Sequence, residues 1–377
     1  MQQALRPYVT AGVAIVTAGL VAATPMAPRL PDLPRLPDLQ TRDVALTSGD
    51  DLLTPWIDQF NLASENATQL LNNFALAPGV GLQQMIANWS GFLQDFFDDP
   101  TSSTVTSISS EMQTNLGTLW TGFTLQNPGG GVPDDIAYPF AQVSMHTMAE
   151  EAQFYWHEIS SFLPPSVSPE VVAPIVNFLG SPLSGIIMGD VGPFISPLVA
   201  LGNSISAGDD LNETLANMVG AFFNGADLNL NSLIPLINQS EYLPFYINNL
   251  GIAFGGLLSP GTVSTGLYND AVAPVGGSIF NSVELDAVGA PGFGNIDFPG
   301  YGIGPLGAWE SWGEIVAGLL GADGWINTGA GADVTAPLAG VTLPIIPDGF
   351  LDAGAASSAA AADLSSLVQD VVSALGL

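Results

Sequence analysis

Basic side chains are confined to the first 42 residues of this 377-residue chain, and this asymmetry limits how the remainder can fold. The four basic residues are Arg6, Arg29, Arg35 and Arg42, whereas nearly all of the 35 acidic residues come later. Residues 43–377 therefore contain no ion pair between a carboxylate and Lys or Arg. We expect the buried polar groups of this part to depend on hydroxyl, amide and backbone partners.

The formal net charge of −31 excludes several classes of partner. We expect the acidic body to repel nucleic acid and anionic lipid headgroups. Phosphorylated substrates are also disfavoured unless a metal or backbone amides hold them, while cations and neutral or apolar partners remain compatible. The chain has no cysteine, which excludes disulfides, thiolate metal sites and cysteine catalysis.

The N-terminus has the pattern of an export signal. Arg6 precedes an apolar run from Val9 to Ala22, and small residues at Val21 and Ala23 favour cleavage before residue 24. An uncleaved anchor helix is the alternative. Residues 1–23 are thus predicted to be a signal peptide and residues 24–42 an extended Pro-rich spacer. Because no later basic residue can fix a cytoplasmic loop, we expect the body to be exported.

One long apolar stretch organises the body of the chain. Val171–Gly202 carries a single charge, Asp190, and is long enough to cross a bilayer once. Its prolines predict two or three short buried helices; a membrane-embedded hairpin is the alternative reading. A second apolar stretch, Tyr242–Gly261, is interpreted in the same way. The prolines of the first stretch are Pro174, Pro182, Pro193 and Pro197.

The predicted fold class is mainly α, with a multi-helix body over residues 43–260. Apolar spacing of three and four residues predicts helices within Ser64–Phe74, Val80–Phe97, Ser110–Phe123 and Leu211–Phe223. Residues 261–347 form a Gly-rich part with a few short strands, and Ser278–Asp286 is its best strand candidate.

Within the Gly-rich part, the sequence returns to a helical pattern over Leu306–Leu320. Residues 348–377 are predicted to close the chain with an amphipathic helix that docks on the core. Too few alternating segments occur for a classical membrane β-barrel. Two domains with a boundary near Gly261, and a single body with a Gly-rich lobe, both fit the pattern.

The two histidines of the chain lie in one predicted helix, Val143–Phe162. His146, Glu150 and His157 fall on the same face and are the metal-ligand candidates. The two histidines are, however, separated by roughly 16 Å along a helix that rises ~1.5 Å per residue. That separation is too long for one ion, so a solvated polar face is the favoured interpretation and we expect no metal.

Catalytic motifs are not found in the sequence. It has no Gly-x-Ser-x-Gly elbow, phosphate loop, dinucleotide fingerprint or His-Glu-x-x-His. Adjacent carboxylates such as Asp98-Asp99 do not face each other on a helix. We therefore expect a non-enzymatic protein without a cofactor. An enzyme that uses carboxylates with His146 or His157 is kept as a third hypothesis.

Three segments resemble a known family. The opening residues 5–25, the Arg42–Ser48 segment RDVALTS and the Phe222–Asn238 segment FFNGADLNLNSLIPLIN are similar to exported proteins of mycobacteria and their relatives, labelled outer-membrane porins of the Gordonia type. The resemblance implies a location in the cell envelope or outer membrane and a channel role. It carries over no catalytic or ligand residue.

Two functional expectations follow. The first is a non-enzymatic envelope protein associated with the outer mycolate membrane or lipid and contributing to permeability. If it forms a pore, it does so as a homo-oligomer of helical or mixed subunits, and its acidic lumen prefers cations. The second is a soluble envelope protein that holds an apolar ligand, such as a lipid, in a helical cavity.

Overall fold

The computed structural model describes residues 50–126, 140–158, 168–239, 243–264, 274–290, 292, 294–322, 335–342 and 344. Over these residues the chain is mainly α-helical with one small open antiparallel sheet, which confirms the predicted fold class. The predicted signal peptide, Pro-rich spacer and C-terminal amphipathic helix lie outside the described residues.

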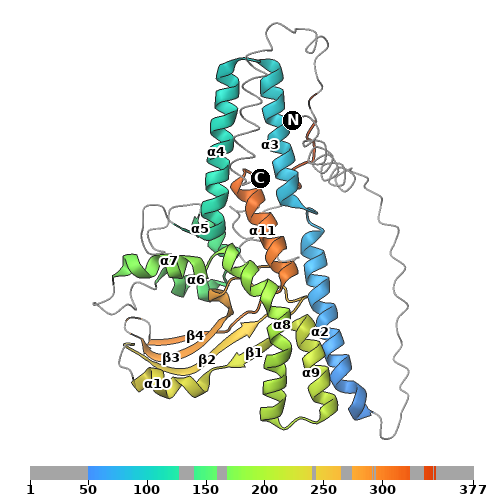
Figure 1. Cartoon of the computed structure of the whole chain (residues 1–377), viewed down its shortest axis with the longest axis vertical. Coiled ribbons are helices and arrows are strands. Elements are labelled where there is room, and N and C mark those ends of the chain that lie inside the picture. Colours follow the sequence, from blue (N-terminus) through green and yellow to red (C-terminus); the bar gives the residue numbers. More distant parts are fainter. Residues whose placement is uncertain are drawn as a thin grey trace, which may run out of the picture.

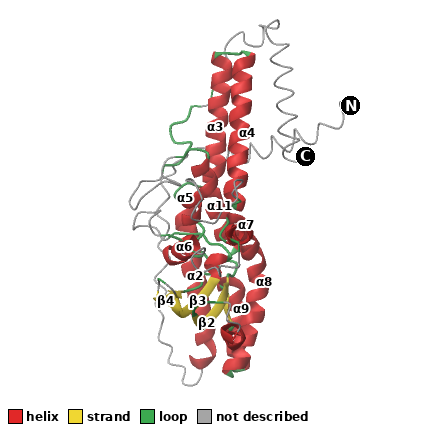
Figure 2. Cartoon of the chain, turned by 90° about the vertical axis from the view of Figure 1, so that its left-hand side faces the viewer, coloured by secondary structure: helices red, strands yellow, loops and turns green. Residues whose placement is uncertain are grey.

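Three helices form the long axis of the molecule (Figure 1). α2 (Asp50–Phe74) and α3 (Val80–Asp98) follow one another, and Gly79 between them has the left-handed φ of 64° that favours glycine. α4 (Ser102–Thr124) then returns beside α3. The far ends of α3 and α4 project as a two-helix hairpin beyond the other described helices and strands (Figure 2).

A second group of helices packs against this axis. α8 (Pro182–Ala207) and α9 (Leu211–Asn224) lie side by side, and α9 also packs against α2. The Asp210 side chain caps α9 by accepting a hydrogen bond from the Glu213 backbone N–H at 2.9 Å. α11 (Pro305–Leu319) packs against both α3 and α8, so it joins the two groups.

The sheet lies on one side of the lower helices (Figure 1). Its order is β1-β2-β3-β4, and every neighbouring pair is antiparallel. Strands from both sides of Gly261 therefore share one sheet. α10 (Ile234–Gln239) follows the 3₁₀ turn Asn231–Leu233 and packs against β2. The strands are β1 (Ala226–Asn229), β2 (Tyr246–Phe254), β3 (Val283–Ala290) and β4 (Gly294–Phe298).

The single helix predicted over Val143–Phe162 is wrong over its described residues, because two helices replace it. α5 (Phe140–Met145) ends in a turn, and α6 (Glu150–His157) begins after it. The turn is held by partners from elsewhere in the chain. The Ser311 hydroxyl donates to the His146 carbonyl at 3.0 Å, and the Ala149 N–H donates to Asn281 Oδ1 at 2.7 Å. These bonds satisfy the backbone where the helix breaks.

The main apolar core gathers around Trp156 of α6. The Trp156 side chain is fully buried, and its indole N–H donates to the Val176 carbonyl at 3.1 Å. Val176 belongs to α7 (Pro169–Leu179), and Ile315 of α11 packs in the same cluster. This core therefore fixes α6 and α7 against α11.

α8 corrects a second expectation, because it continues through Pro193 and Pro197 as one helix of 26 residues. Prolines remove helical hydrogen bonds, so other contacts must hold this segment together. The Ser196 hydroxyl lies 3.1 Å from the carbonyl oxygens of both Phe254 and Gly255, and donates to them. α7 and α8 thus divide the Val171–Gly202 stretch between them.

The inward face of α8 contains many small residues. A β-carbon added at Gly185 or Gly192 would collide with the carbonyl oxygen of Gly277 or Gly255, respectively. The larger Ile186 and Met188 are buried beside them, and five other large apolar residues lie on the outward face. We call them the α8 stripe: Ile187, Val191, Phe194, Leu198 and Ile205, between 43% and 74% exposed.

Two glycines of α8 are expected to respond to alanine with opposite signs. Gly192→Ala forces a shift against backbone and should lower the free energy of unfolding by about 1–3 kcal/mol. Gly202→Ala meets no atom within 4 Å and should raise it by up to about 1 kcal/mol through helix propensity. Urea unfolding followed by circular dichroism measures both. Equal effects of the two substitutions would contradict the close packing at Gly192.

Candidate functional site

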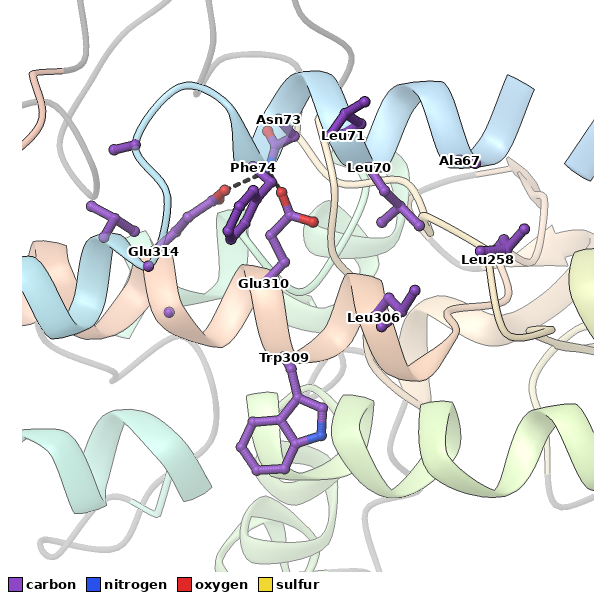
Figure 3. Close-up of a pocket in the computed structure, with 14 residues that line it drawn as sticks. Ala67, Leu70, Leu71, Asn73, Phe74, Leu258, Leu306, Trp309, Glu310 and Glu314 are labelled. Atoms are coloured by element: carbon purple, nitrogen blue, oxygen red, sulfur yellow. Dashed lines mark hydrogen bonds between the residues drawn. The ribbon is translucent and has the colours of Figure 1, made fainter. Parts of the chain in front are cut away.

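An apolar cavity of about 500 Å³ lies between α2, the start of α3 and α11. Leu70 of α2 and Leu306 of α11 line the cavity, together with Leu258 from the segment after β2 (Figure 3). Leu306 and three further lining side chains, Leu71, Phe74 and Trp309, are partly exposed and connect the cavity to the surface. We call this site the α2–α11 cavity; its volume suits a small organic ligand.

A carboxamide and two carboxyl groups form the polar end of the cavity. Glu310 and Glu314 are one turn apart on α11, and both point toward Asn73 of α2 (Figure 3). Asn73 Nδ2 donates to Glu310 Oε1 at 2.9 Å and to Glu314 Oε1. Asn73 and Glu314 are 1% and 2% exposed. The cavity therefore combines an apolar wall with a small acidic end.

His146 lies behind this acidic end. Its Nδ1 is 3.7 Å from Glu314 Oε2, and both side chains are buried. The turn that carries His146 is fixed by Ser311, which lies on α11 between the two glutamates. The burial of Glu314 thus depends on the break between α5 and α6 that the sequence did not predict.

Glu310 has a perturbed acidity. Burial raises its pKa to about 7, and the hydrogen bond from Asn73 opposes this rise only in part. No lysine or arginine follows residue 42 to favour the ionised form. Near neutral pH this carboxyl group is therefore divided between its neutral and charged states, at a site where a ligand can reach it.

The three metal candidates are not brought together. His146 is buried beside Glu314, Glu150 is exposed in the first turn of α6, and His157 ends that helix with its ring against Trp156 at a centroid separation of 5.0 Å. No group of three or more histidine or acidic side chains among the described residues has the arrangement of a metal site.

Sequence reasoning missed Asn73, Glu310 and Glu314. One signal was available: two carboxylates four residues apart in the segment Pro305–Leu319, which is otherwise free of charge. Asn73, which donates hydrogen bonds to both carboxylates, could not be predicted in this way, because it is 237 positions from Glu310 in the sequence.

A second, more polar cleft of about 420 Å³ lies between α2 and the sheet. Asp227 and Tyr301 line it together with backbone of the Gly-rich segment. Burial, and to a lesser degree the nearby Glu284, raises the pKa of Asp227. The cleft offers no apolar wall comparable to that of the α2–α11 cavity.

No family model, curated protein or solved structure matches this chain. Of the helices in the described ranges, α8 alone is long and apolar enough to cross a membrane, a property that core helices of soluble proteins share.

Proposed function

We propose that the protein is an exported, non-enzymatic component of the cell envelope that binds an apolar molecule in the α2–α11 cavity. The cavity carries this proposal, because its walls are apolar side chains and four of them extend to the surface. Burial of an alkyl chain there contributes about 0.8 kcal/mol for each methylene removed from water. Export is supported by the confinement of basic residues to the first 42 positions.

Displacement of a fluorescent probe tests the proposal. The full chain is titrated with the uncharged fluorophore N-phenyl-1-naphthylamine, which is then displaced by dodecanol. We expect saturable binding of one dodecanol molecule per chain. Fluorescence that rises without saturation, or that dodecanol does not reduce, would contradict a defined site.

Association with a lipid layer is the second candidate function, and the α8 stripe favours it. Glycines of α8 pack closely against other backbone, and the α8 stripe leaves five large apolar residues exposed. Both features are common where helices meet lipid. The envelope location and the permeability role implied by the family resemblance belong to this candidate. Because the sheet is small and open, a cation-preferring pore would require several helical subunits.

Flotation with neutral phosphatidylcholine vesicles tests the lipid candidate. Phe194→Glu places a charge in the α8 stripe and should lower vesicle partitioning at least about 30-fold, since a charge in the bilayer costs about 2–3 kcal/mol. Leu236→Glu is the matched control, because Leu236 of α10 is 73% exposed and Phe194 is 74% exposed. Wild-type protein that stays with the unbound fraction would rule the candidate out. A doubled mass in solution would assign the stripe to a second copy instead.

A further inference from the structure

The polar atoms that the α2–α11 cavity presents are hydrogen-bond acceptors. Asn73 is 1% exposed, and its two recorded donor bonds both go to carboxylates on α11. Its Oδ1 is buried without a hydrogen-bond partner among the described residues. That oxygen is closed off from the cavity, so the acceptor that a ligand can reach is the half-buried Glu310 carboxylate. The head of a matching ligand must therefore supply N–H or O–H groups.

The charges around the cavity determine which kind of donor group on a ligand is favoured. Glu310 and Glu314 are the carboxylates beside Asn73, and His146 is the titratable group next to Glu314. The helices that pack on α11 add no positive charge: α8 carries only the exposed Asp190, and the carboxylates of α3, Asp95 and Asp98, lie in its last turn. α2 carries carboxylates and no basic residue. A cationic head is thus favoured and an anionic head is repelled.

We propose that the α2–α11 cavity selects molecules with an apolar body and an ammonium head, whose N–H groups donate to the Glu310 carboxylate. This inference rests on the proposed function, since it names the ligand class of the same cavity. An ammonium group has three donors and no acceptor, which matches the ionised Glu310 carboxylate, a group that only accepts. A fatty-acid carboxylate has no donor and brings a like charge to Glu310.

Ligand binding is also coupled to the proton of Glu310. Burial raises the pKa of this carboxyl group to about 7, so it is mostly neutral at pH 6 and mostly ionised at pH 8. The ammonium head binds the ionised form. Affinity for an alkylamine should therefore rise about tenfold from pH 6 to pH 8, whereas affinity for an uncharged alcohol should not.

Three probes of equal chain length test the inference with the full chain: dodecylamine, dodecanol and dodecanoate. We expect dodecylamine to bind at least about tenfold more tightly than dodecanoate at pH 8, since ionic hydrogen bonds are stronger than neutral ones. Glu310→Gln keeps an acceptor for Asn73 and removes the charge. It should reduce the amine-to-acid ratio to within about threefold and abolish the pH dependence. Glu111→Gln, at an exposed position of α4, is the matched control.

Each outcome separates the two proposals. If dodecanol does not bind, the cavity is not a site for apolar ligands and the proposed function fails. If dodecanol binds but amine and acid bind equally, only the ammonium inference fails. A preference for the amine that persists in Glu310→Gln would also overturn it, because the selectivity would then arise from the net charge of the chain.

Discussion

Leucine in place of Gly313 is expected to weaken dodecanol binding at least about tenfold, because the new side chain would occupy the volume of two or more ligand methylenes. Gly313 lines the α2–α11 cavity from α11, and a β-carbon there meets no atom within 4 Å. The substitution therefore fills space at the site without a clash at the β-carbon. Displacement of N-phenyl-1-naphthylamine measures the change in affinity.

Gly117→Leu provides the control for this experiment. Gly117 is an exposed glycine within α4, it lies outside the cavity, and a β-carbon there also meets nothing within 4 Å. Both variants exchange a helical glycine for leucine, so they share the gain in helix propensity. Unchanged affinity in Gly313→Leu, or equal losses in both variants, would show that dodecanol binds elsewhere.

Truncation of Trp156 to alanine should lower the free energy of unfolding by about 3–5 kcal/mol, the range for large buried aromatic residues. The side chain is fully buried, packs with Met148 and Ile315, and donates its N–H to the Val176 carbonyl. Chemical unfolding monitored by circular dichroism measures the loss. The turn that carries His146 and the part of α11 that carries Glu314 both pack against this core. Dodecylamine binding should therefore weaken as well.

Two further tryptophan variants make this prediction specific. Trp156→Phe retains most of the packing but removes one of the two donors to the Val176 carbonyl, because the Gly180 N–H still donates to it. We therefore expect a smaller loss of about 1–2 kcal/mol, which unfolding experiments can still measure. Trp120→Ala removes a side chain that is 66% exposed on α4, and its effect should stay within about 0.5 kcal/mol. Similar losses at Trp120 and Trp156 would contradict the described core.

Helices with regular apolar spacing were predictable from local sequence. The predicted Val80–Phe97 corresponds to α3 (Val80–Asp98), and the predicted Leu306–Leu320 corresponds to α11 (Pro305–Leu319). Their apolar faces repeat every three to four residues, and this spacing reflects contacts that any packed helix needs. The overall fold class followed from these segments.

Tertiary contacts decided the segments that were predicted incorrectly. Pro193 and Pro197 remain inside α8 because its inward face packs on backbone from distant loops. β2 was not predicted as a strand because a register shift between Ile247 and Asn249 interrupts its alternation of buried and exposed residues. Neither feature can be read from the local sequence.

The candidate site was less predictable than the fold. The sequence drew attention to His146, Glu150 and His157 because their spacing matched one continuous helix, and the turn at residues 146–149 removes that helix. Of the three, only His146 lies near the cavity. The acidic end depends on Asn73 of α2, whose partner Glu314 lies 241 positions later, and no local pattern reports such a pairing.

The pairing of early and late segments has a consequence for the order of synthesis. Trp56 of α2 donates a hydrogen bond to Asn212, 156 positions later, and Asn73 meets Glu314 after a still longer interval. Helix α2 therefore cannot form these contacts until the later segments have been synthesised. Contacts between residues far apart in sequence also slow folding. A newly made chain that stays uncompacted for longer is easier to thread through a narrow translocation channel.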